Sequence, residues 1–438
     1  MPRPLLPPPA SLAHTPVGLG PPPAPVARLL GGPPLVGRST LDEHLARFGR
    51  LPCDAGDLSS PEELIDLVGR SGLCGRGGAS FPTARKLAAV ARQPGSAIVV
   101  ANGTEGEPAS SKDKVLLARS PHLVIDGAVL AAQAVGAAEA IIVCHRAVRE
   151  LVDVALSERR LSRIDSIRLR AATGADRFVA GEASAVVHWL ERGVATPTRT
   201  PPRLAERGLC GRPTLLQNVE TLAHLALIAR FGPEWFRAVG TEAEPGSMLV
   251  SLLGAVQRPG VYEIAIGTPV GGVLEVGCGA VAGARAILVG GYFGTWIPFE
   301  TALRRPFSRA GLASLGAGPG AGLVAVLPAD ACGLVETARV ARYLALESAG
   351  QCGPCVFGLP AIAGELEALA SGGPFNLARL QRWLGQVEGR GACSHPDGAV
   401  RLVRSSLRVF GYELERHSRG RCCAPPRTEV LPVPALPR

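Results

Sequence analysis

Three cysteines and a histidine near the end of the chain have the types and spacing of metal ligands. The stretch ESAGQCGPCVFG places Cys352 and Cys355 in a C-x2-C pair, and Cys393 and His395 follow further along. Thiolates at this spacing ligate iron–sulfur clusters, and such a pair with a later cysteine and histidine also fits zinc. Ala349 stands where a further thiolate would complete C-x2-C-x2-C. The pattern predicts a metal centre that lacks one cysteine ligand.

Several groups could replace the missing thiolate. His395 is near in sequence, whereas Cys332 would lie about 25 Å from Ala349 along a straight helix that rises about 1.5 Å per residue. Cys422 and Cys423 are more remote candidates. We expect a [4Fe-4S] cluster with His395 as fourth ligand. A [3Fe-4S] cluster on three thiolates, a zinc ion, or thiols without a metal are the alternatives.

The segment GLCGRGGASFPTARK contains a glycine-rich loop that leads into a helix. Glycines let backbone N–H groups approach an anion closely, and a helix N-terminus favours negative charge. The residues available to a phosphate are Gly75, Arg76, Gly77, Gly78, Arg85 and Lys86. A tight turn without a ligand is the alternative interpretation of this loop.

The turn NGTEGEP follows a short apolar strand, AIVVA. In open α/β sheets, ligands bind beyond the carboxyl ends of the strands. Asn102, Glu105 and Glu107 therefore occupy positions from which they could bond the ring nitrogens or hydroxyls of a cofactor.

The segments around these motifs alternate between helix and strand. SSPEELIDLVGRSG predicts a helix that is capped by Ser60, begins with Pro61 and stops at Gly72. Further on, HLVIDGAVLAAQAVGA predicts a buried helix, and EAIIVCH a buried strand. Such alternation is typical of a parallel α/β sheet, and we assign residues 37–243 to this domain.

The pattern changes twice after this domain. Residues 244–328 contain short strands joined by Pro-Gly and Gly-Gly turns, which predicts a small β-rich domain. Residues 329–415 have apolar side chains at helical spacing and predict a helical domain around the cysteine motif. The proline-rich residues 1–36 are predicted to be a flexible leader, and residues 416–438 a flexible tail.

Composition limits the class of protein. The 438 residues carry a net charge of +9, which suits an acidic partner; no nucleic-acid-binding motif accompanies it, so we expect no nucleic-acid role. The 11 cysteines and the absence of a signal peptide predict reduced thiols in the cytoplasm. The most apolar window, 121–144, contains Asp126 and Glu139, so we expect a soluble protein without a membrane span.

Four motifs occur in a characteristic order: GLCGRGGASFPTARK, NGTEGEPASSKDK, FVAGEASA and GRPTLLQNVET. Together they resemble the flavin- and NADH-binding subunit of respiratory complex I and the related hydrogenase, formate dehydrogenase and RnfC-type flavoproteins. PGVYE and LVGGYFG resemble that family's SLBB (soluble-ligand-binding β-grasp) domain. ESAGQCGPC with Cys393 resembles its iron–sulfur domain, so the resemblance covers about residues 40–415.

The resemblance implies an α/β flavin-binding domain, an SLBB-like β-grasp domain and a helical iron–sulfur domain. It implies FMN bound by the glycine loop and strand ends, a cluster that takes its electrons, and possible binding of NAD(H), with Phe81 against the adenine. Gly181 and Glu182 match the start of the family's G-E-E-T turn. The implied cofactor contacts are Gly75, Arg76, Gly77, Gly78, Phe81, Lys86, Asn102, Glu105, Glu107, Gly181, Glu182 and Asn218.

The sequence departs from this family mainly where NADH would bind. A tyrosine, a second stacking ring and several polar side chains are replaced, which weakens nicotinamide contacts more than flavin contacts. The substituted positions are Ala89, Thr104, Phe178, Ala183, Thr200 and Arg203.

We expect an electron-transfer flavoprotein subunit, an NADH dehydrogenase-like oxidoreductase that passes electrons from NAD(P)H or a reduced partner through FMN to the cluster. The acceptor would be an acidic ferredoxin-like protein or small iron–sulfur subunit, with a quinone-linked, membrane-bound reductase beyond it. The chain would be cytoplasmic, or peripheral at the inner face of the membrane through a partner. The alternative is a catalytically degenerate structural or assembly subunit, which Thr104, Ala183 and Ala349 favour.

Overall fold

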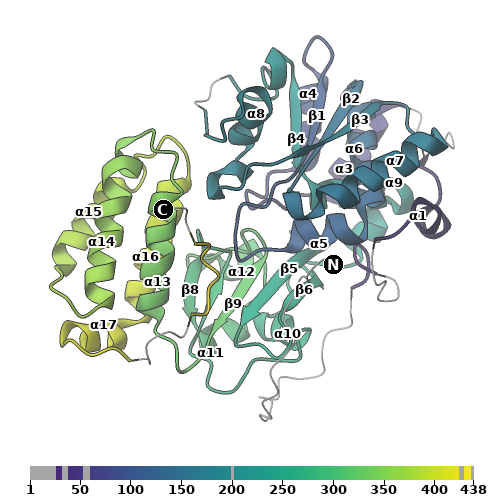
Figure 1. Ribbon diagram of the computed structural model, residues 1–438. Coiled ribbons are helices and arrows are strands. Elements are labelled where there is room, and N and C mark those ends of the chain that lie inside the picture. Colours follow the sequence, from purple (N-terminus) through teal and green to yellow (C-terminus); the bar gives the residue numbers. More distant parts are fainter. Residues whose placement is uncertain (1–25, 32–37, 53–59, 199–201, 424–428, 436–438) are drawn as a thin grey trace.

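The computed structural model describes residues 26–31, 38–52, 60–198, 202–423 and 429–435. These residues form an α/β domain, a mixed β-sheet with short helices, and a helical domain, in that order along the chain (Figure 1). The helical domain lies beside the mixed sheet, and the α/β domain lies above that sheet in the view of Figure 1.

The α/β domain is built on four parallel strands in the order β3-β2-β1-β4. Its strands are β1 (Ile98–Gly103), β2 (Glu139–Cys144), β3 (Arg168–Thr173) and β4 (Thr214–Asn218). Its helices are α1 (Leu41–Phe48), α3 (Pro61–Ser71), α4 (Thr83–Ala91), α5 (Lys112–Arg119), α6 (Pro121–Ala134), α7 (Arg149–Ser162), α8 (Ala183–Arg192) and α9 (Val219–Arg237). Short 3-10 turns cover Arg146–Val148, Phe178–Gly181 and Leu209–Gly211.

The two faces of this sheet are covered by different helices. Successive side chains of a strand point to opposite faces, so Val99 and Ala101 of β1 share a core with α6 and α9. Ile98 and Val100 pack on the other face with Val186 of α8. Burial on both faces is the reason that β1 and β2 are continuous apolar runs.

The apolar window 121–144 is helix α6 followed by strand β2, as predicted. Helix α6 is buried on nearly all sides, and its Asp126 carboxylate accepts hydrogen bonds from His44 and Arg159 at 2.7 and 2.8 Å. Among the described helices, none alone is long and apolar enough to cross a membrane; α5 and α6 would qualify only as a pair, and they meet at 96°.

The second part is a five-stranded mixed sheet in the order β6-β5-β9-β7-β8. The central strands β5 and β9 are parallel, and the remaining neighbours are antiparallel. Its elements are β5 (Ser247–Gly254), β6 (Gly260–Ala265), α10 (Val270–Glu275), β7 (Ala286–Val289), β8 (Thr295–Pro298), α11 (Phe299–Leu303), α12 (Arg309–Ala313) and β9 (Leu323–Leu327).

The helical domain packs directly on this sheet. Trp296 of β8 donates its backbone N–H to Ser405 Oγ and its indole N–H to Thr337 Oγ1, at 3.0 and 3.1 Å. The domain contains α13 (Gly333–Leu346), a π-helical turn (Pro354–Gly358), α14 (Leu359–Ala370), α15 (Leu377–Val387), α16 (His395–Val409) and α17 (Gly411–Ser418). The shared core shows that this domain is part of one packed body with the sheet.

Residues 26–31 differ from the flexible leader that the sequence predicts for 1–36; residues 1–25 and 32–36 lie outside the described part of the chain. Leu29 is fully buried, and the backbone N–H groups of Arg28 and Leu29 donate to Glu263 Oε2 at 2.9 and 2.8 Å. The Arg28 guanidinium lies 3.9 Å from the ring centroid of Trp235. Two adjacent leucines in a short proline-rich stretch give no periodic signal, so the sequence did not reveal this contact.

Helix α17, which ends at Ser418, and residues 429–435 differ from the flexible tail predicted for 416–438; residues 424–428 and 436–438 lie outside the described part of the chain. Leu431 is only 1% exposed, and its backbone N–H donates to Glu336 Oε2 at 2.8 Å. The Tyr292 hydroxyl donates to the carbonyl of Pro432 at 2.6 Å. This segment therefore joins α13 to the loop between β7 and β8.

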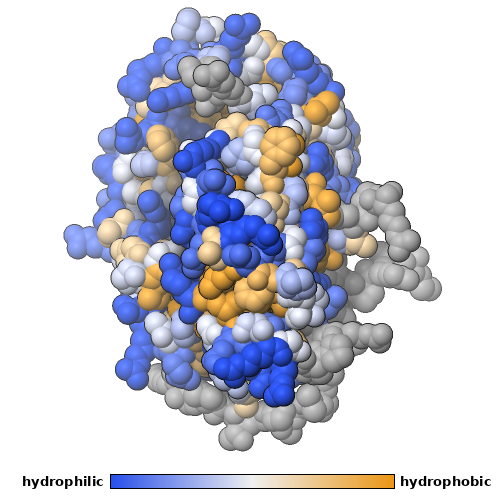
Figure 2. Space-filling model, turned by 90° about the vertical axis from the view of Figure 1, so that its left-hand side faces the viewer, coloured by the Kyte–Doolittle hydropathy of each residue, from blue (hydrophilic) through white to orange (hydrophobic). Residues whose placement is uncertain are grey.

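The face presented by the helical domain carries a patch of apolar side chains among hydrophilic ones (Figure 2). The described large apolar residues of this domain with exposed side chains are Leu346, Val356, Phe357 and Tyr412. Three of them flank the C-x2-C motif, so apolar surface adjoins the cysteines.

Candidate functional site

Two asparagines lie opposite each other at the carboxyl ends of neighbouring parallel strands. Asn102 of β1 is in register with Asn218 of β4. Asn218 Oδ1 accepts from the backbone N–H of Glu220 and caps α9, while its Nδ2 donates to Asp113 Oδ2 at 2.7 Å. Asn102 Nδ2 donates to the carbonyl of Gly181 at 3.0 Å. The sheet edge at which open α/β folds bind ligands is thus fixed by side-chain hydrogen bonds.

The glycine-rich loop comes very close to this edge. A Cβ atom on Gly77 would lie 3.3 Å from Cβ of Asn218, so a side chain at this position would press the loop away from the strand end. Gly78 has φ of +103° and borders Gly320 of the mixed-sheet domain. This close approach suits an anion that is bound by backbone N–H groups.

Arg76 belongs to the same loop, but its guanidinium is buried. Its Nε, Nη1 and Nη2 donate to the carbonyls of Ser247, Cys74 and Pro245 at 3.2, 3.0 and 3.2 Å. Burial lowers the pKa of Arg76. The geometry gives no support to the expectation that this charge would face a phosphate; the side chain holds the loop against β5.

Lys86 and Phe81 are better placed to meet a ligand. The Lys86 ammonium donates to the carbonyl of Leu216 near the carboxyl end of β4, and burial lowers its pKa to about 8. Phe81 is 49% exposed, and the Arg85 guanidinium lies 5.6 Å from its ring centroid. An exposed ring beside a cation is a surface on which a planar group can stack.

Two of the predicted cofactor contacts use their carboxylates to hold helix ends. Glu105 adopts a left-handed φ of +49°, and its carboxylate accepts from the backbone N–H groups of Asp113 and Lys114 at 3.1 and 3.0 Å. Glu182 caps α8 by accepting from the backbone N–H groups of Ser184 and Ala185. These carboxylates shape the turns, which leaves the backbone of each turn as the surface for a ligand.

Glu107 has a free acceptor inside the protein. Its Oε2 accepts from the backbone N–H of Tyr292 at 2.9 Å, but its Oε1 is buried without a hydrogen-bond partner. Burial raises the pKa of Glu107 to about 7, although the N–H groups of Tyr292 and Ala109 act in the opposite direction. A buried, unpaired carboxyl oxygen at a sheet edge is a feature that a bound polar group would satisfy.

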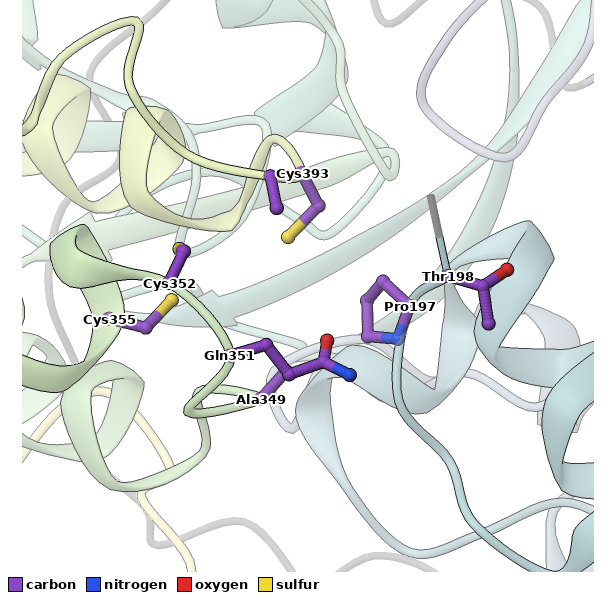
Figure 3. Close-up of a pocket in the computed structure, with 8 residues that line it drawn as sticks. Pro197, Thr198, Ala349, Gln351, Cys352, Cys355 and Cys393 are labelled. Atoms are coloured by element: carbon purple, nitrogen blue, oxygen red, sulfur yellow. The ribbon is translucent and has the colours of Figure 1, made fainter. Parts of the chain in front are cut away.

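The three cysteines line one cavity of about 340 Å³ (Figure 3). Cys352 and Cys355 come from the turn before α14, and Cys393 from the loop before α16. Ala349 lines the same cavity, as the spacing of the motif predicted. The remaining lining residues are Pro197, Thr198, Gln351 and Ala392. A space more than ten times the roughly 30 Å³ that one water occupies suits a cluster of several atoms better than a single ion.

The thiols of this cavity differ in their surroundings. Burial acts to raise the pKa of Cys352, but hydrogen bonds from the backbone N–H groups of Ala392 and Cys355 and from the Cys355 thiol outweigh it and lower the pKa. Burial and the neighbouring Cys352 raise the pKa of Cys355 to about 12, and burial also raises that of Cys393. A positively charged metal centre would offset these rises, because thiolates are the ligating form.

None of the candidate fourth ligands lines the cavity, neither His395 nor Cys332, Cys422 or Cys423. His395 is buried, and its Nε2 lies 2.8 Å from the carbonyl of Leu344, which leaves Nδ1 without a hydrogen-bond partner. The Phe178 and Phe293 rings meet the imidazole edge-on. Cys332 lies at the start of α13 next to Glu413, in a different side-chain group. The role of His395 as a ligand stays a prediction.

The loop before the cysteine motif contacts the α/β domain. The backbone N–H of Phe178 donates to Glu347 Oε2 at 2.8 Å, and Arg177 Nη2 donates to the carbonyl of Ser348 at 3.2 Å. The Phe178 ring stacks near Tyr292, with ring centroids 6.3 Å apart. The phenylalanine that replaces the family's tyrosine therefore joins the two candidate sites.

Sequence reasoning missed a buried ionic network behind the sheet edge. Lys112 Nζ donates to Asp113 Oδ1 at 2.7 Å and to Glu220 Oε2 at 2.8 Å. Burial acts to lower the pKa of Lys112, but the two carboxylates outweigh it and hold the pKa above its usual value. Burial raises the pKa of Asp113 to about 6. The only sequence indication was the run KDK at 112–114, because charged residues are rarely buried unless they are paired.

Comparisons with known proteins agree with this architecture. Residues 68–227 match the family described as Nuo51 FMN-binding domain. Residues 336–417 match the NADH-ubiquinone oxidoreductase-F iron-sulfur binding region. The NADH-quinone oxidoreductase F subunit of Aquifex aeolicus is 31% identical over 399 residues, which are 86% of this chain and 91% of that protein. The corresponding protein of Streptomyces coelicolor is 32% identical over 381 residues, which are 83% of this chain and 85% of that protein.

A solved structure supports the same relationship. A chain of the NAD+-reducing [NiFe]-hydrogenase in the air-oxidized state superposes with a TM-score of 0.76 at 33% identity and covers 82% of this chain. This chain spans 63% of that hydrogenase chain. The protein is a flavin- and iron–sulfur-type oxidoreductase subunit by fold, and it belongs to the family of NADH-quinone oxidoreductase F subunits. The family and both cofactor-binding regions were predicted correctly.

Proposed function

We propose that this chain is an electron-transfer subunit in which FMN at the α/β sheet edge is linked to an iron–sulfur cluster on Cys352, Cys355 and Cys393. The observation that carries the proposal is the cysteine cavity itself, whose wall includes Pro197 and Thr198 of the α/β domain. The two candidate sites are therefore built on adjoining parts of one packed body.

At the proposed flavin site, the chain supplies backbone N–H groups and a positively charged side chain. The backbone N–H groups of Gly77 and Gly78 would hold the phosphate, and Lys86 would add positive charge. The N–H of Gly75 donates to the carbonyl of Phe81 at 2.9 Å and supports the loop. The carboxyl edge around Asn102 would hold the remainder of the cofactor, and Glu107 Oε1 offers an acceptor there. When bound, FMN supplies the conversion between two-electron and one-electron chemistry.

On the metal side, three thiolates and a cavity of about 340 Å³ suit a [4Fe-4S] cluster. Ala349 leaves one position without a thiolate, and water would serve there unless His395 reorients. Exposed Val356 and Phe357 beside the motif support a protein acceptor that docks close to the cluster, such as a small iron–sulfur subunit or a ferredoxin. Through such a partner the chain would lie at the inner face of a membrane.

NAD(H) is the proposed donor. Phe81, with Arg85 beside its ring, provides one stacking surface for an adenine, and no second ring stands at Ala89. We therefore expect weaker NADH binding than in relatives with two rings. Thr200, one of the substituted positions, lies outside the described residues.

The mixed-sheet part, residues 244–328, is proposed to be the SLBB-like β-grasp domain. Its first and last strands, β5 and β9, lie side by side in parallel at the centre, with an antiparallel partner strand outside each. The contact between Tyr292 and Glu107 supports a role in closing the flavin site.

The experiment is anaerobic purification with flavin, iron and zinc counted on the same sample. EPR spectra are then recorded before and after reduction by NADH, NADPH or dithionite. We expect one FMN, a cluster signal in the reduced sample, and NADH-dependent reduction of ferricyanide. A folded protein without flavin would overturn the flavin assignment, and one without iron would overturn the cluster assignment.

A catalytically degenerate structural subunit is the second candidate. Thr104 replaces an acid and is buried, with its hydroxyl oxygen unpaired. Together with Ala183 and Ala349, it removes polar groups from both sites. This candidate predicts neither flavin absorbance nor iron, so the same purification separates the two functions.

A further inference from the structure

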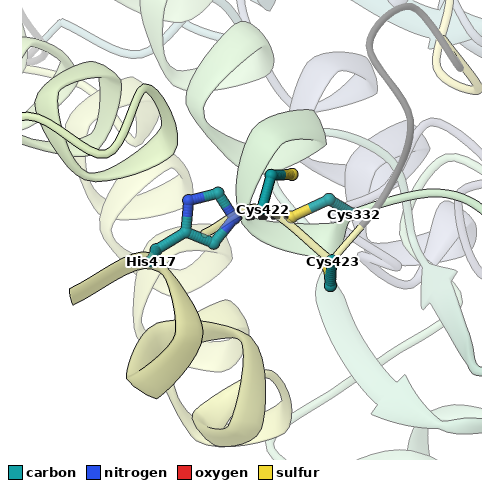
Figure 4. Close-up of side chains that lie close together, drawn as sticks. All are labelled: Cys332, His417, Cys422 and Cys423. Carbon is teal, nitrogen blue, oxygen red and sulfur yellow. Dashed lines mark hydrogen bonds between the residues drawn. The ribbon is translucent and has the colours of Figure 1, made fainter. Parts of the chain in front are cut away.

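Four metal-ligand side chains meet at the far end of the helical domain, apart from the three-cysteine cavity. They are Cys332, His417, Cys422 and Cys423, and their Sγ and imidazole nitrogen atoms all lie within 4.8 Å of one another (Figure 4). We propose that these four residues bind one zinc ion that fastens the end of α17 and the chain after it to the start of α13. This zinc site is independent of the proposed electron-transfer function.

The separation of the ligand atoms suits a single ion. Four ligands placed tetrahedrally at the usual Zn–S and Zn–N distances stand about 3.5–3.8 Å apart. Cys332 Sγ lies 3.2 Å from His417 Nε2, and the whole group fits within 4.8 Å. An iron–sulfur cluster needs wider spacing, because each thiolate binds a different iron. Three cysteines and one histidine are a common ligand set of structural zinc.

The histidine is already oriented as a ligand. His417 is 2% exposed, and its Nδ1 lies 3.0 Å from the carbonyl of Leu369. A carbonyl only accepts, so Nδ1 carries the proton and the lone pair of Nε2 faces Cys332 Sγ. This support of the non-ligating nitrogen is typical of metal-bound histidines.

Local backbone geometry brings the last two cysteines back to the group. Gly420 has φ of +70°, a left-handed conformation that turns the chain after α17. A Cβ on Gly372 would lie 3.2 Å from Gly420 Cα, so the turn is packed against the end of α14. Cys422 and Cys423 then face the start of α13, where Cys332 caps the helix with its backbone.

A zinc ion and the Arg285 guanidinium would offset most of the negative charge of three thiolates and Glu413. Zinc binding would release the thiol protons to solvent. The Cys332 thiol donates to the fully buried Glu413 Oε2 at 3.2 Å. After loss of the thiol proton, this oxygen would still accept a hydrogen bond from the backbone N–H of Leu334. Arg285 Nη2 donates to Glu413 Oε1, and its Nη1 lies 4.0 Å from Cys423 Sγ. The guanidinium therefore offsets negative charge on both neighbours.

None of the comparisons assigns this group. The iron-sulfur binding region matches residues 336–417, so three of the four side chains lie outside it. The group also includes the vicinal pair Cys422 and Cys423, which does not line the three-cysteine cavity.

The test is metal analysis of the full chain, purified anaerobically with thiol reductant, in the native form and in single variants. We expect one zinc per native chain, and its loss in Cys332→Ser and Cys423→Ser. The matched controls are Cys278→Ser, an exposed cysteine of the mixed-sheet domain, and Cys352→Ser in the other cavity. Both controls should keep the zinc. Cobalt(II) in place of zinc should give intense thiolate charge-transfer bands that weaken in Cys422→Ser, whose exposed side chain makes misfolding a poor explanation.

Three results would overturn the proposal. The first is a native chain without zinc whose four side chains bind no added Zn²⁺ or Co²⁺. The second is zinc that disappears in Cys352→Ser but persists in Cys332→Ser, which would place the ion in the other cavity. The third is a disulfide between Cys332 and Cys423, visible as a cross-linked peptide in unreduced digests. The first and third results do not bear on flavin or iron content. The second would also count against the cluster, and the iron count of the same sample reports that separately.

Discussion

The backbone N–H of Phe178 donates to Glu347 Oε2 at 2.8 Å and joins the α/β domain to the loop that precedes the cysteine motif. Glu347→Ala removes this acceptor together with the contact to Arg177, whose Nε lies 3.7 Å away. We expect a loss of about 1–3 kcal/mol of unfolding free energy, because the bond involves a charged group. Flavin and iron contents should be unchanged, while reduction of the cluster by flavin slows in rapid-mixing absorbance traces.

Glu367→Ala is the matched control for this contact. Glu367 pairs with Arg342 in the same helical domain, and the pair is partly exposed. Its removal should leave the rate of cluster reduction unchanged. Equal slowing in both variants would show that the helical domain is loosened in general and that the Phe178 contact has no special role.

Gly77→Ala tests the approach of the loop to the strand end. The new Cβ would lie 3.3 Å from Asn218 Cβ, so the loop must move by a few tenths of an ångström. We expect FMN affinity to fall by about tenfold, or about 1.4 kcal/mol, in a fluorescence titration. Gly69→Ala in helix α3 meets only ordinary contact at 3.7 Å and should bind FMN normally. Unchanged FMN binding in Gly77→Ala would place the cofactor elsewhere.

Ala349→Cys should supply the thiolate that the motif lacks. Ala349 lines the cavity with the three cysteines, so a sulfur there can reach the same cluster. We expect the variant to keep its iron longer in air than the native chain, because a thiolate replaces an exchangeable ligand. Iron content and EPR spectra over a time course measure this. Ala361→Cys in helix α14 is the control; equal protection by both would indicate a general thiol effect.

Glu107 predicts a pH dependence of stability. Burial raises the pKa of Glu107 to about 7 in the folded chain, above the ordinary value of 4.5. The folded state then holds a proton that the unfolded state has released, so unfolding free energy falls as pH rises from about 4.5 to 7. Glu107→Gln should remove a difference on the order of 2–3 kcal/mol between pH 5 and pH 8 in urea titrations.

Glu62→Gln is the control for this pH effect, since Glu62 lies on the exposed first turn of α3. It should leave the pH profile of the native chain unchanged. A Glu107→Gln profile with the native slope would mean that another group titrates in this range.

The order of helices and strands was readable from the sequence because local patterns decide it. Ser60, Pro61 and Gly72 bound helix α3 as the capping pattern predicted. The apolar runs of β1 and β2 are continuous because both faces of a parallel sheet are covered. The cysteine cavity was also readable, since two of its sulfur atoms lie one turn apart and ligand spacing is a local property.

Side-chain roles that depend on distant partners were not readable. The positive charge of Arg76 suggested a phosphate contact, but its guanidinium donates to the carbonyls of Pro245 and Ser247. These residues lie far along the chain, and nothing in the sequence indicates that they contact Arg76. The burial of Leu431 depends on Glu336 in the same way. Cys332 and His417 are 85 residues apart and meet only through the packing of α13 against α17.

The contacts of the Arg76 guanidinium also limit where the chain can be cut for truncation or domain exchange. Because two of its donors bind the carbonyls of Pro245 and Ser247, a cut near residue 244 would leave the cation with only the Cys74 carbonyl as acceptor and expose the base of the glycine loop. The boundary suggested by sequence composition is therefore a poor place for truncation or domain exchange. Gene fusions and chimaeras should fold only when they keep the α/β domain and the mixed-sheet domain together.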